Sequence, residues 1–255
     1  MNRIQKLFQH KPSRILSVFF TAGFPRLNDT RRVILELAQA GADMIEIGMP
    51  YSDPIADGPT IQHSNQIALA NGMSLNLLFE QIRDIRRETD IPLLLMGYVN
   101  PVLQYGMERF IEKAAEVGID GLILPDLPMA EYQLLYCPLM DAKGMSNIFL
   151  VTPQTSQARI RQIDEASQGF IYVVSSDSTT GRTGSFSDTQ KAYFQRIQEM
   201  ELRNPTLIGF GIHDAETFSA ASQYACGAIV GSAFIKALES ENADIHTFVH
   251  TLIKQ

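Results

Sequence analysis

Residues 38–48 read AQAGADMIEIG, and this stretch contains the unit that recurs along the chain. Its first part ends an amphipathic segment at Gly41, and glycine commonly supplies the left-handed residue that ends a helix. Its second part begins a short, almost continuously apolar run, which is typical of a strand buried in a parallel sheet. The same order recurs at 114–124 (AAEVGIDGLIL) and 140–150 (MDAKGMSNIFL). The pattern predicts alternating helices and parallel strands.

Apolar runs of this kind occur eight times. They predict strands at 15–23, 44–49, 92–98, 121–126, 147–153, 170–175, 206–211 and 228–234. Amphipathic segments, with apolar residues three and four apart, lie between several of them. Eight strand–helix units in 255 residues are the number and length of a (β/α)8 TIM barrel, an α/β fold. An open doubly wound sheet is the alternative, but it normally has fewer strands in this length, and no GxGxxG motif follows the first run.

Two segments fall outside the eightfold pattern. Residues 2–9 predict an extra N-terminal helix that could close the N-terminal end of the barrel. Residues 244–254 predict a terminal helix that packs on the outer ring. Because no linker, low-complexity tract or block of charge interrupts the chain, we expect one domain over residues 1–255.

The composition narrows the classes of ligand and location. The net charge is −7 and no basic run occurs, so nucleic acid and anionic membranes are poor candidates as partners. The start lacks the apolar core of a signal peptide, and no apolar run approaches the roughly 20 residues of a membrane helix, so we expect a cytoplasmic protein. Cys137 and Cys226 lie far apart without metal-binding motifs. We expect two reduced, buried thiols and no metal site.

Two connections between a strand and its helix are longer than the others. Residues 50–73 follow the second predicted strand, and residues 176–186 follow the sixth. Long connections in compact domains tend to be functional. In a TIM barrel both would open at the C-terminal face, where active sites of this fold lie.

Two carboxyl groups stand at this face. Alternation along MIEIGM places Ile45 and Ile47 towards the helices, so Glu46 should face the barrel interior. A carboxyl held there is partly desolvated, which suits it to proton transfer near neutral pH. Asp57 lies in the rigid sequence PIADGP, and two carboxyls in different surroundings can divide acid and base roles. The alternatives are a glutamate satisfied by an internal hydrogen bond and an aspartate that only caps a turn.

Glycines at the ends of the last strands predict an anion site. The seventh run ends in GFGI (209–212) and the eighth in GSAF (231–234). Loops at these positions of TIM barrels often bind phosphate through backbone N–H groups, although a tight turn without ligand is an alternative. The candidates, including one from the 176–186 connection, are Gly181, Gly211, Gly231 and Ser232.

Apolar and aromatic side chains near the same face predict the wall of a pocket. The candidates are Phe19, Ile61, Tyr98, Tyr172 and Phe210. Such a wall suits a flat ring better than a bare sugar phosphate. His63 and His213 lie nearby, but the sequence shows no serine, cysteine or metal partner for either, and we expect no catalytic role for them.

The segment at 46–62, EIGMPYSDPIADGPTIQ, resembles the signature of the tryptophan synthase alpha subunit family. The resemblance extends along essentially the whole chain through FFTAGFP (19–25), YVNP (98–101), LPDLP (124–128), TG (180–181), GFGI (209–212) and VGSA (230–233). It implies a (β/α)8 barrel that cleaves indole-3-glycerol phosphate to indole and glyceraldehyde 3-phosphate. This is a retro-aldol reaction that needs no cofactor in this chain.

The resemblance also implies a role for each candidate. Glu46 would be the general acid/base that protonates the indole ring carbon and helps to deprotonate the glycerol hydroxyl. Asp57 would stabilise the positive charge that develops at the indole nitrogen, and Tyr172 would line the site near Glu46. The ring would be held by Phe19, Ile61, Tyr98 and Phe210. The phosphate would rest on Gly181, Gly211, Gly231 and Ser232.

In this family the partner is a beta subunit that carries pyridoxal phosphate (PLP) and receives indole through an internal tunnel in an α2β2 assembly. By resemblance, Asp53 and Pro54 would contact that partner together with the 176–186 connection, and the PLP would belong to the partner. Two departures lie near this face. Phe24 stands where the first motif commonly has aspartate, and SSDSTTG (175–181) differs from the glycine and valine that many relatives have before TG.

Other functions remain open from the sequence. One is a different enzyme on the same barrel, such as a sugar-phosphate isomerase or an aldolase, although a Schiff-base aldolase would need a lysine in a strand and the eight runs contain none. A second is a stand-alone lyase that releases free indole. A third is a catalytically weak subunit that only activates a beta partner, which predicts loss of Glu46 or Asp57, and both are present.

Overall fold

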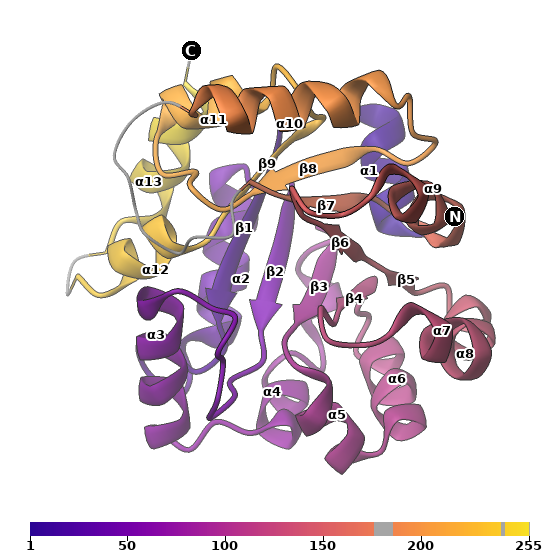
Figure 1. Cartoon of the computed structure of the whole chain (residues 1–255). Coiled ribbons are helices and arrows are strands. Elements are labelled where there is room, and N and C mark those ends of the chain that lie inside the picture. The colour runs from indigo at the N-terminus through magenta and orange to yellow at the C-terminus, as the bar shows by residue number, and fades with distance from the viewer. Residues whose placement is uncertain (176–185, 241–242, 255) are drawn as a thin grey trace.

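The computed structural model describes residues 1–175, 186–240 and 243–254. Its centre is a sheet of nine strands in the order β5-β4-β3-β2-β1-β9-β8-β7-β6 (Figure 1). All neighbouring strands run parallel. The strands are β1 (Ile15–Thr21), β2 (Met44–Gly48), β3 (Leu93–Met96), β4 (Gly121–Ile123), β5 (Ser146–Asn147), β6 (Phe149–Val151), β7 (Ile171–Val174), β8 (Thr206–Gly209) and β9 (Gly227–Val230).

The fifth predicted strand is divided into β5 and β6. Ser146 and Asn147 pair with β4, whereas β6 pairs with β7. Only Ile148 separates the two parts, and its N–H still donates to the Leu122 carbonyl at 2.8 Å. The two edges of the sheet are therefore joined through the chain itself, and the strands form a nearly closed barrel. The predicted (β/α)8 fold is confirmed.

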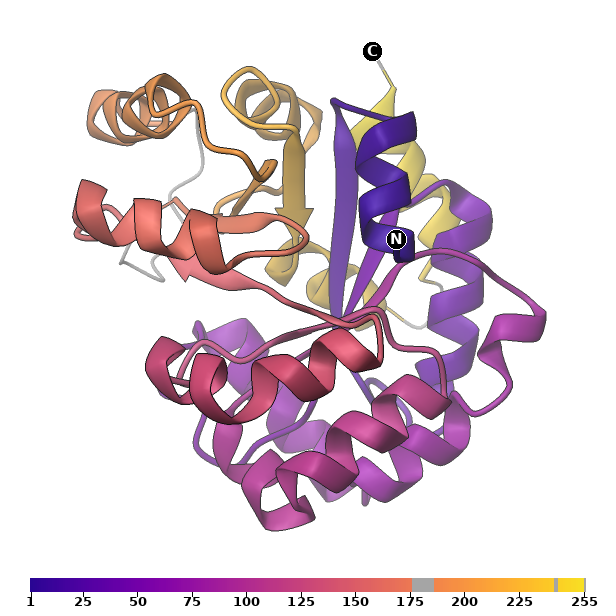
Figure 2. The same ribbon diagram turned by 90° about the vertical axis from the view of Figure 1, so that its right-hand side faces the viewer.

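Helices surround the strands (Figures 1 and 2). The helical segments are α1 (Arg3–His10), α2 (Asp29–Ala40), α3 (Pro59–Ala70), α4 (Leu75–Gln81), the 3₁₀ turn η1 (Ile85–Arg87), α5 (Val99–Tyr105), α6 (Met107–Glu116), α7 (Met129–Glu131), the π-helical η2 (Tyr132–Tyr136), α8 (Cys137–Ala142), α9 (Gln157–Ala166), α10 (Asp188–Glu199), α11 (Ala215–Ala221), α12 (Ser232–Leu238) and α13 (Ile245–Ile253). As expected for the terminal helix, α13 packs against the outer helix α2.

Most predicted strands run past their observed ends, and two boundaries differ most from the prediction. The connection after β2 is much shorter than 50–73, because α3 already begins at Pro59, where the fixed φ of proline suits the first helical position. The predicted strand at 228–234 ends at Val230, because α12 begins at Ser232. In the second case the apolar run of the strand continues into the helix, so the sequence did not mark the boundary.

Alternation along the strands separates two apolar clusters. Ile45 and Ile47 of β2 pack in an outer cluster with the helices, whereas Met44 belongs to an inner cluster that fills the barrel. The inner cluster also contains Ile4 of α1, which is fully buried, and Leu7 packs against it. The N-terminal helix therefore closes one end of the barrel, as predicted.

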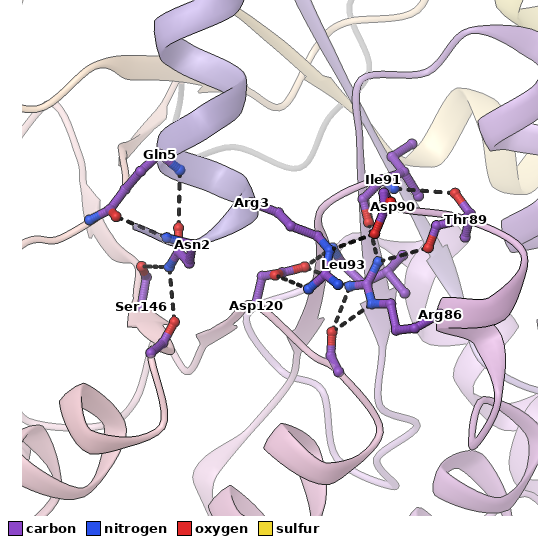
Figure 3. Close-up of polar contacts among 12 residues, drawn as sticks. Asn2, Arg3, Gln5, Arg86, Thr89, Asp90, Ile91, Leu93, Asp120 and Ser146 are labelled. Atoms are coloured by element: carbon purple, nitrogen blue, oxygen red, sulfur yellow. Dashed lines mark hydrogen bonds and ion pairs between the residues drawn. The ribbon is translucent and has the colours of Figure 1, made fainter.

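Polar contacts fix this helix to the starts of three strands (Figure 3). The buried Asp120 carboxylate accepts hydrogen bonds from Arg3 (3.2 Å), Arg86 (2.6 Å) and the Leu93 N–H (2.9 Å). Asn2 caps α1 and donates to the Ser146 hydroxyl at 2.8 Å. This end of the barrel is therefore tied down, and active sites of this fold lie at the opposite, C-terminal end of the strands.

Candidate active site

Glu46 lies in the middle of β2 with its side chain inside the barrel and fully buried, as alternation predicted. Its Oε1 accepts a hydrogen bond of 2.8 Å from the Ser17 hydroxyl. Its Oε2 is buried and has no hydrogen-bond partner among the described residues. A buried oxygen without a partner is costly in a folded protein. It is therefore an available position for a group of a bound substrate.

The surroundings of Glu46 favour its neutral form. Burial raises the pKa of the carboxyl to about 8, and the hydrogen bond from Ser17 opposes this shift. The side chain consequently keeps its proton at neutral pH, and its pKa is close to that of an effective general acid/base.

Asp57 lies in the loop between β2 and α3. The loop is folded by a hydrogen bond from the Asp57 N–H to the Pro54 carbonyl (3.0 Å), and Gln62 donates to the Asp57 carbonyl (2.9 Å). The half-buried carboxylate accepts a hydrogen bond of 3.3 Å from Tyr98. Burial raises the pKa of Asp57 to about 6, and the Tyr98 hydroxyl opposes this. Asp57 is therefore ionised at neutral pH while Glu46 is protonated.

The electrostatics of Tyr172 involve both carboxyls. Its side chain, on β7, is almost fully buried, and its ring contacts that of Phe210 with 6.2 Å between centroids. The pKa of Tyr172 lies well above its usual value because of burial first, and then because of the charges of Glu46 and Asp57. Both carboxyls therefore lie within electrostatic range of one hydroxyl. Glu46 on the strand and Asp57 on the loop therefore act on the same region of the barrel.

Glycines leave room for the two rings nearest to these groups. A Cβ at Gly209 would lie 2.2 Å from the Tyr172 hydroxyl oxygen, and a Cβ at Gly48 would lie 2.6 Å from Cζ of Phe19. Phe19 is the partner of Glu46 in the β1–β2 ladder. The aromatic rings are thus seated over neighbouring strands that have no side chain at these points.

The remaining wall candidates are placed differently. Tyr98 contacts Asp57 and stacks obliquely on Tyr51, with 5.1 Å between ring centroids. Ile61, on α3, packs in the outer cluster between the sheet and the helices. The described contacts bring Tyr172 and Phe210 together and put Tyr98 beside the loop aspartate, but they do not join Ile61 to either group.

The phosphate candidates follow the last two strands of the barrel. Phe210 and Gly211 have φ values of 70° and 75°, so the backbone makes a left-handed turn directly after β8. Gly231 immediately precedes α12, and Ser232 is its first residue, where N–H groups have no intrahelical acceptor. Gly181 and nearly all of the 176–186 connection lie outside the described residues.

The predicted partner-contact residues lie on the loop that carries Asp57. Asp53 is exposed, whereas Pro54 is buried. The next residue, Ile55, is an apolar side chain with 88% of its surface exposed. The loop thus combines a packed residue with an apolar residue that faces outward.

Other candidates play local structural parts in this structure. His63 is exposed, and Nδ1 of His213 lies 3.0 Å from the Gly211 carbonyl oxygen. Cys137 and Cys226 are free, but they are half-buried rather than buried as predicted, because each lies at the margin of its apolar cluster. Within 1–175, 186–240 and 243–254, no group of three or more His, Cys, Asp or Glu side chains is placed to hold a metal ion. No helix in the described part of the chain is long and apolar enough to cross a membrane.

Sequence reasoning missed Ser17 beside Glu46, Tyr51 beside the tyrosine that contacts Asp57, and Ser175 beside the turn at Phe210. Ser17 donates to Glu46, Tyr51 stacks on Tyr98, and the Ser175 hydroxyl donates to the Phe210 carbonyl at 2.7 Å. Alternation from Phe19 could have placed Ser17 inside the barrel, because the two are separated by one residue on the same strand. The contacts of Tyr51 and Ser175 depend on loop geometry and had no comparable signal.

Comparison with known proteins identifies close relatives over the full chain. The family model of the tryptophan synthase alpha chain matches residues 6–255. The tryptophan synthase alpha chain of Flavobacterium psychrophilum is 56% identical over 251 residues and that of Flavobacterium johnsoniae 55% over 251, with 98% of both chains covered in each case. The crystal structure of the tryptophan synthase alpha chain from Legionella pneumophila subsp. pneumophila superposes with a TM-score of 0.87 at 31% identity, over 99% of this chain and 96% of that one.

Proposed function

The chain belongs to the tryptophan synthase alpha chain family, and from this premise we propose how its residues cleave indole-3-glycerol phosphate. The protein is a lyase that converts this substrate to indole and glyceraldehyde 3-phosphate. The residue roles rest chiefly on one observation: the fully buried Glu46 carboxyl has one oxygen without a partner among the described residues. Its raised pKa favours the protonated form, whereas the pKa of Asp57, about 6, leaves that group ionised at neutral pH.

In this proposal Glu46 begins as an acid. Its proton passes to the ring carbon that bears the glycerol chain, and the ring nitrogen becomes positively charged as the electron pair leaves the ring double bond. The resulting carboxylate then takes the proton of the adjacent glycerol hydroxyl. The oxygen forms the aldehyde, the carbon–carbon bond breaks, and its electron pair returns to the ring. Glu46 ends the cycle protonated, and protons and electrons balance without a cofactor.

Asp57 supplies the negative charge that this sequence requires. The intermediate carries a positive charge at the indole nitrogen, and a carboxylate that hydrogen-bonds the N–H stabilises that charge most in a site with little water. The hydrogen bond from Tyr98 to Asp57 keeps the carboxylate in place and ionised. Asp57 therefore acts on the charge, while Glu46 moves the protons.

The flat ring and the phosphate are held by different parts of the barrel. We propose that Phe19, Tyr172 and Phe210 pack on the indole, with Tyr98 and Ile61 bordering the loop side. The phosphate would be bound by backbone N–H groups of Gly211, Gly231 and Ser232, and Gly181, which lies outside the described residues, is the fourth candidate. Such groups at the end of β8 and the start of α12 suit an anion.

Family membership implies a beta subunit partner. We propose that this partner holds PLP, that it receives indole from this chain within an α2β2 assembly, and that Asp53 and Pro54 belong to the contact. The assignment of Asp53 and Pro54 rests on the family resemblance and on their place in the loop that carries Asp57. We also propose that the single domain over residues 1–255 works in the cytoplasm.

An assay of indole release tests this function. Purified chain is mixed with indole-3-glycerol phosphate, alone and with a beta subunit, and indole and aldehyde are measured together. We expect equimolar products and a faster reaction with the partner. Equal rates with and without partner would instead identify a stand-alone lyase, and absence of cleavage in both mixtures would leave only an activating subunit. Glu46→Gln serves as the catalytic control.

A further inference from the structure

We infer that Ser17 is a positioning residue for Glu46: its hydroxyl holds one oxygen of the carboxyl, so that the other oxygen is presented to the substrate. The inference rests on the proposed role of Glu46. It goes beyond that role because it assigns the geometry of the proton donor to a second side chain.

The contact joins two fully buried side chains on adjacent strands. Ser17 Oγ lies 2.8 Å from Glu46 Oε1, and neither residue is exposed. The ladder between β1 and β2 pairs Ser17 with Met44 and Phe19 with Glu46, so Ser17 reaches the carboxyl diagonally. Because both groups stand on paired strands rather than loops, the distance between them is set by the barrel itself.

Ser17 also approaches from the side that leaves the mouth free. On β1 it stands one inward-facing position closer to the N-terminal end than Phe19, the direct neighbour of Glu46. That end of the barrel is closed by α1. The hydroxyl thus occupies Oε1 from the closed side, and Oε2 is the oxygen without a partner among the described residues.

The surroundings leave Ser17 as the main polar support of the carboxyl. Across the other ladder, Glu46 is paired with Leu94, which is apolar, and on β1 its neighbour is Phe19. The titratable groups that act with it are Tyr172 and, through the same hydroxyl, Asp57. Burial raises the pKa of Glu46, and Ser17 lowers it by donating to the carboxylate. A hydroxyl that donates to the ionised form stabilises Glu46 after it has given up its proton.

Ser17→Ala provides the test, with Ser64→Ala as its matched control. Both serines are fully buried, but the Ser64 hydroxyl contacts Thr21 and the Ile61 carbonyl instead of Glu46. We expect Ser17→Ala to lower kcat on the order of tenfold or more with little change in KM, since a hydrogen bond to a charged group is lost. The descending limb of the profile of kcat/KM against pH should move to higher pH. Ser64→Ala should leave the pH position of that limb unchanged. Ser17→Thr keeps the hydroxyl, so its limb should return to the wild-type position.

Two further arms separate the possible failures. If Glu46→Gln retains turnover, the proposed role of Glu46 is wrong, whatever Ser17 does. If Glu46→Gln is inactive but the descending limb of Ser17→Ala stays at the wild-type pH, only the positioning role of Ser17 is overturned. This holds whether or not kcat is lowered. Ser17→Cys, whose thiol is a weak donor, serves if the alanine variant does not fold. In Ser17→Cys the Glu46 carboxyl is titrated by ¹³C NMR, with its signal assigned through Glu46→Gln. The pKa of Glu46 should be higher than in the wild type, and an unchanged pKa would refute the inference.

Discussion

The Tyr98 hydroxyl lies 3.3 Å from Oδ2 of Asp57 and accepts a hydrogen bond of 3.0 Å from the Ala56 N–H. A residue just beyond β3 therefore holds the loop that follows β2 at two points. The loop aspartate is placed relative to the barrel by this tyrosine, and the charges of both Asp57 and Glu46 contribute to the raised pKa of Tyr172. The proposed roles, proton transfer by Glu46 and charge stabilisation by Asp57, depend on this placement. These roles can be tested through the protonation states of the two carboxyls.

The rate of cleavage should show a bell-shaped dependence on pH. Asp57 must be ionised, so kcat/KM should rise as pH increases through about 6, and Glu46 must be protonated, so kcat/KM should fall as pH increases through about 8. Asp57→Asn should lower kcat on the order of a hundredfold or more. It should also remove the acidic limb while binding of glycerol phosphate persists. A variant that keeps this limb would assign it to another group.

Tyr98→Phe should move the acidic limb without abolishing activity. The hydroxyl lowers the pKa of Asp57 by donating to its carboxylate, so its removal should raise that pKa and shift the limb to higher pH. Tyr51→Phe is the matched control, because the Tyr51 hydroxyl contacts Asn100 and not Asp57. Identical profiles for the two variants would mean that Tyr98 does not tune the aspartate.

Glu46→Gln should abolish indole release and change how stability depends on pH. The pKa of Glu46 is raised from 4.5 to about 8 in the folded protein, so folding binds a proton within that window. The stability contributed by the neutral carboxyl is fully present below 4.5, and it is lost as pH rises towards 8. The wild type should therefore lose stability relative to Glu46→Gln across this range, and level off above it. Denaturant unfolding of both proteins at several pH values measures the difference, and parallel curves would contradict the shifted pKa.

The barrel was predictable because its strands are short apolar runs with regular alternation. The same alternation placed Glu46 inside, and it also contained the information that Ser17 lies beside it. The break at Ile148 was not predictable, because NIFLV reads as one strand and only pairing with different neighbours divides it. Residues that meet through loops, such as Tyr51 and Tyr98, could not be paired from sequence, since their contact depends on the path of the loop after β2.

The phosphate site remains a prediction, and Gly211→Val tests it. Gly211 has a φ of 75°, which a β-branched residue adopts only with strain, so the turn after β8 should be displaced. We expect weaker binding of glycerol phosphate by calorimetry and a higher KM. Gly144→Val is the matched control, because Gly144 has a φ of 68° but lies at the closed end of the barrel, after α8. If both variants bind glycerol phosphate as the wild type does, the anion is held elsewhere.

At the closed end of the barrel, Asp120→Ala should destabilise the fold far more than Asp90→Ala. The Asp120 side chain is 3% exposed and satisfies Arg3, Arg86 and a backbone N–H, so its loss leaves the largely buried Arg86 without its carboxylate. Removing one partner of a buried ion pair costs about 3–5 kcal/mol. Asp90 is 90% exposed and pairs with the same Arg3 from the solvent side, and such pairs contribute about 1 kcal/mol or less. Because the pair lies at the end opposite the catalytic groups, both variants should retain kcat when folded. Comparable losses in the free energy of unfolding for the two variants would show that the Asp120 network does not hold α1 on the barrel.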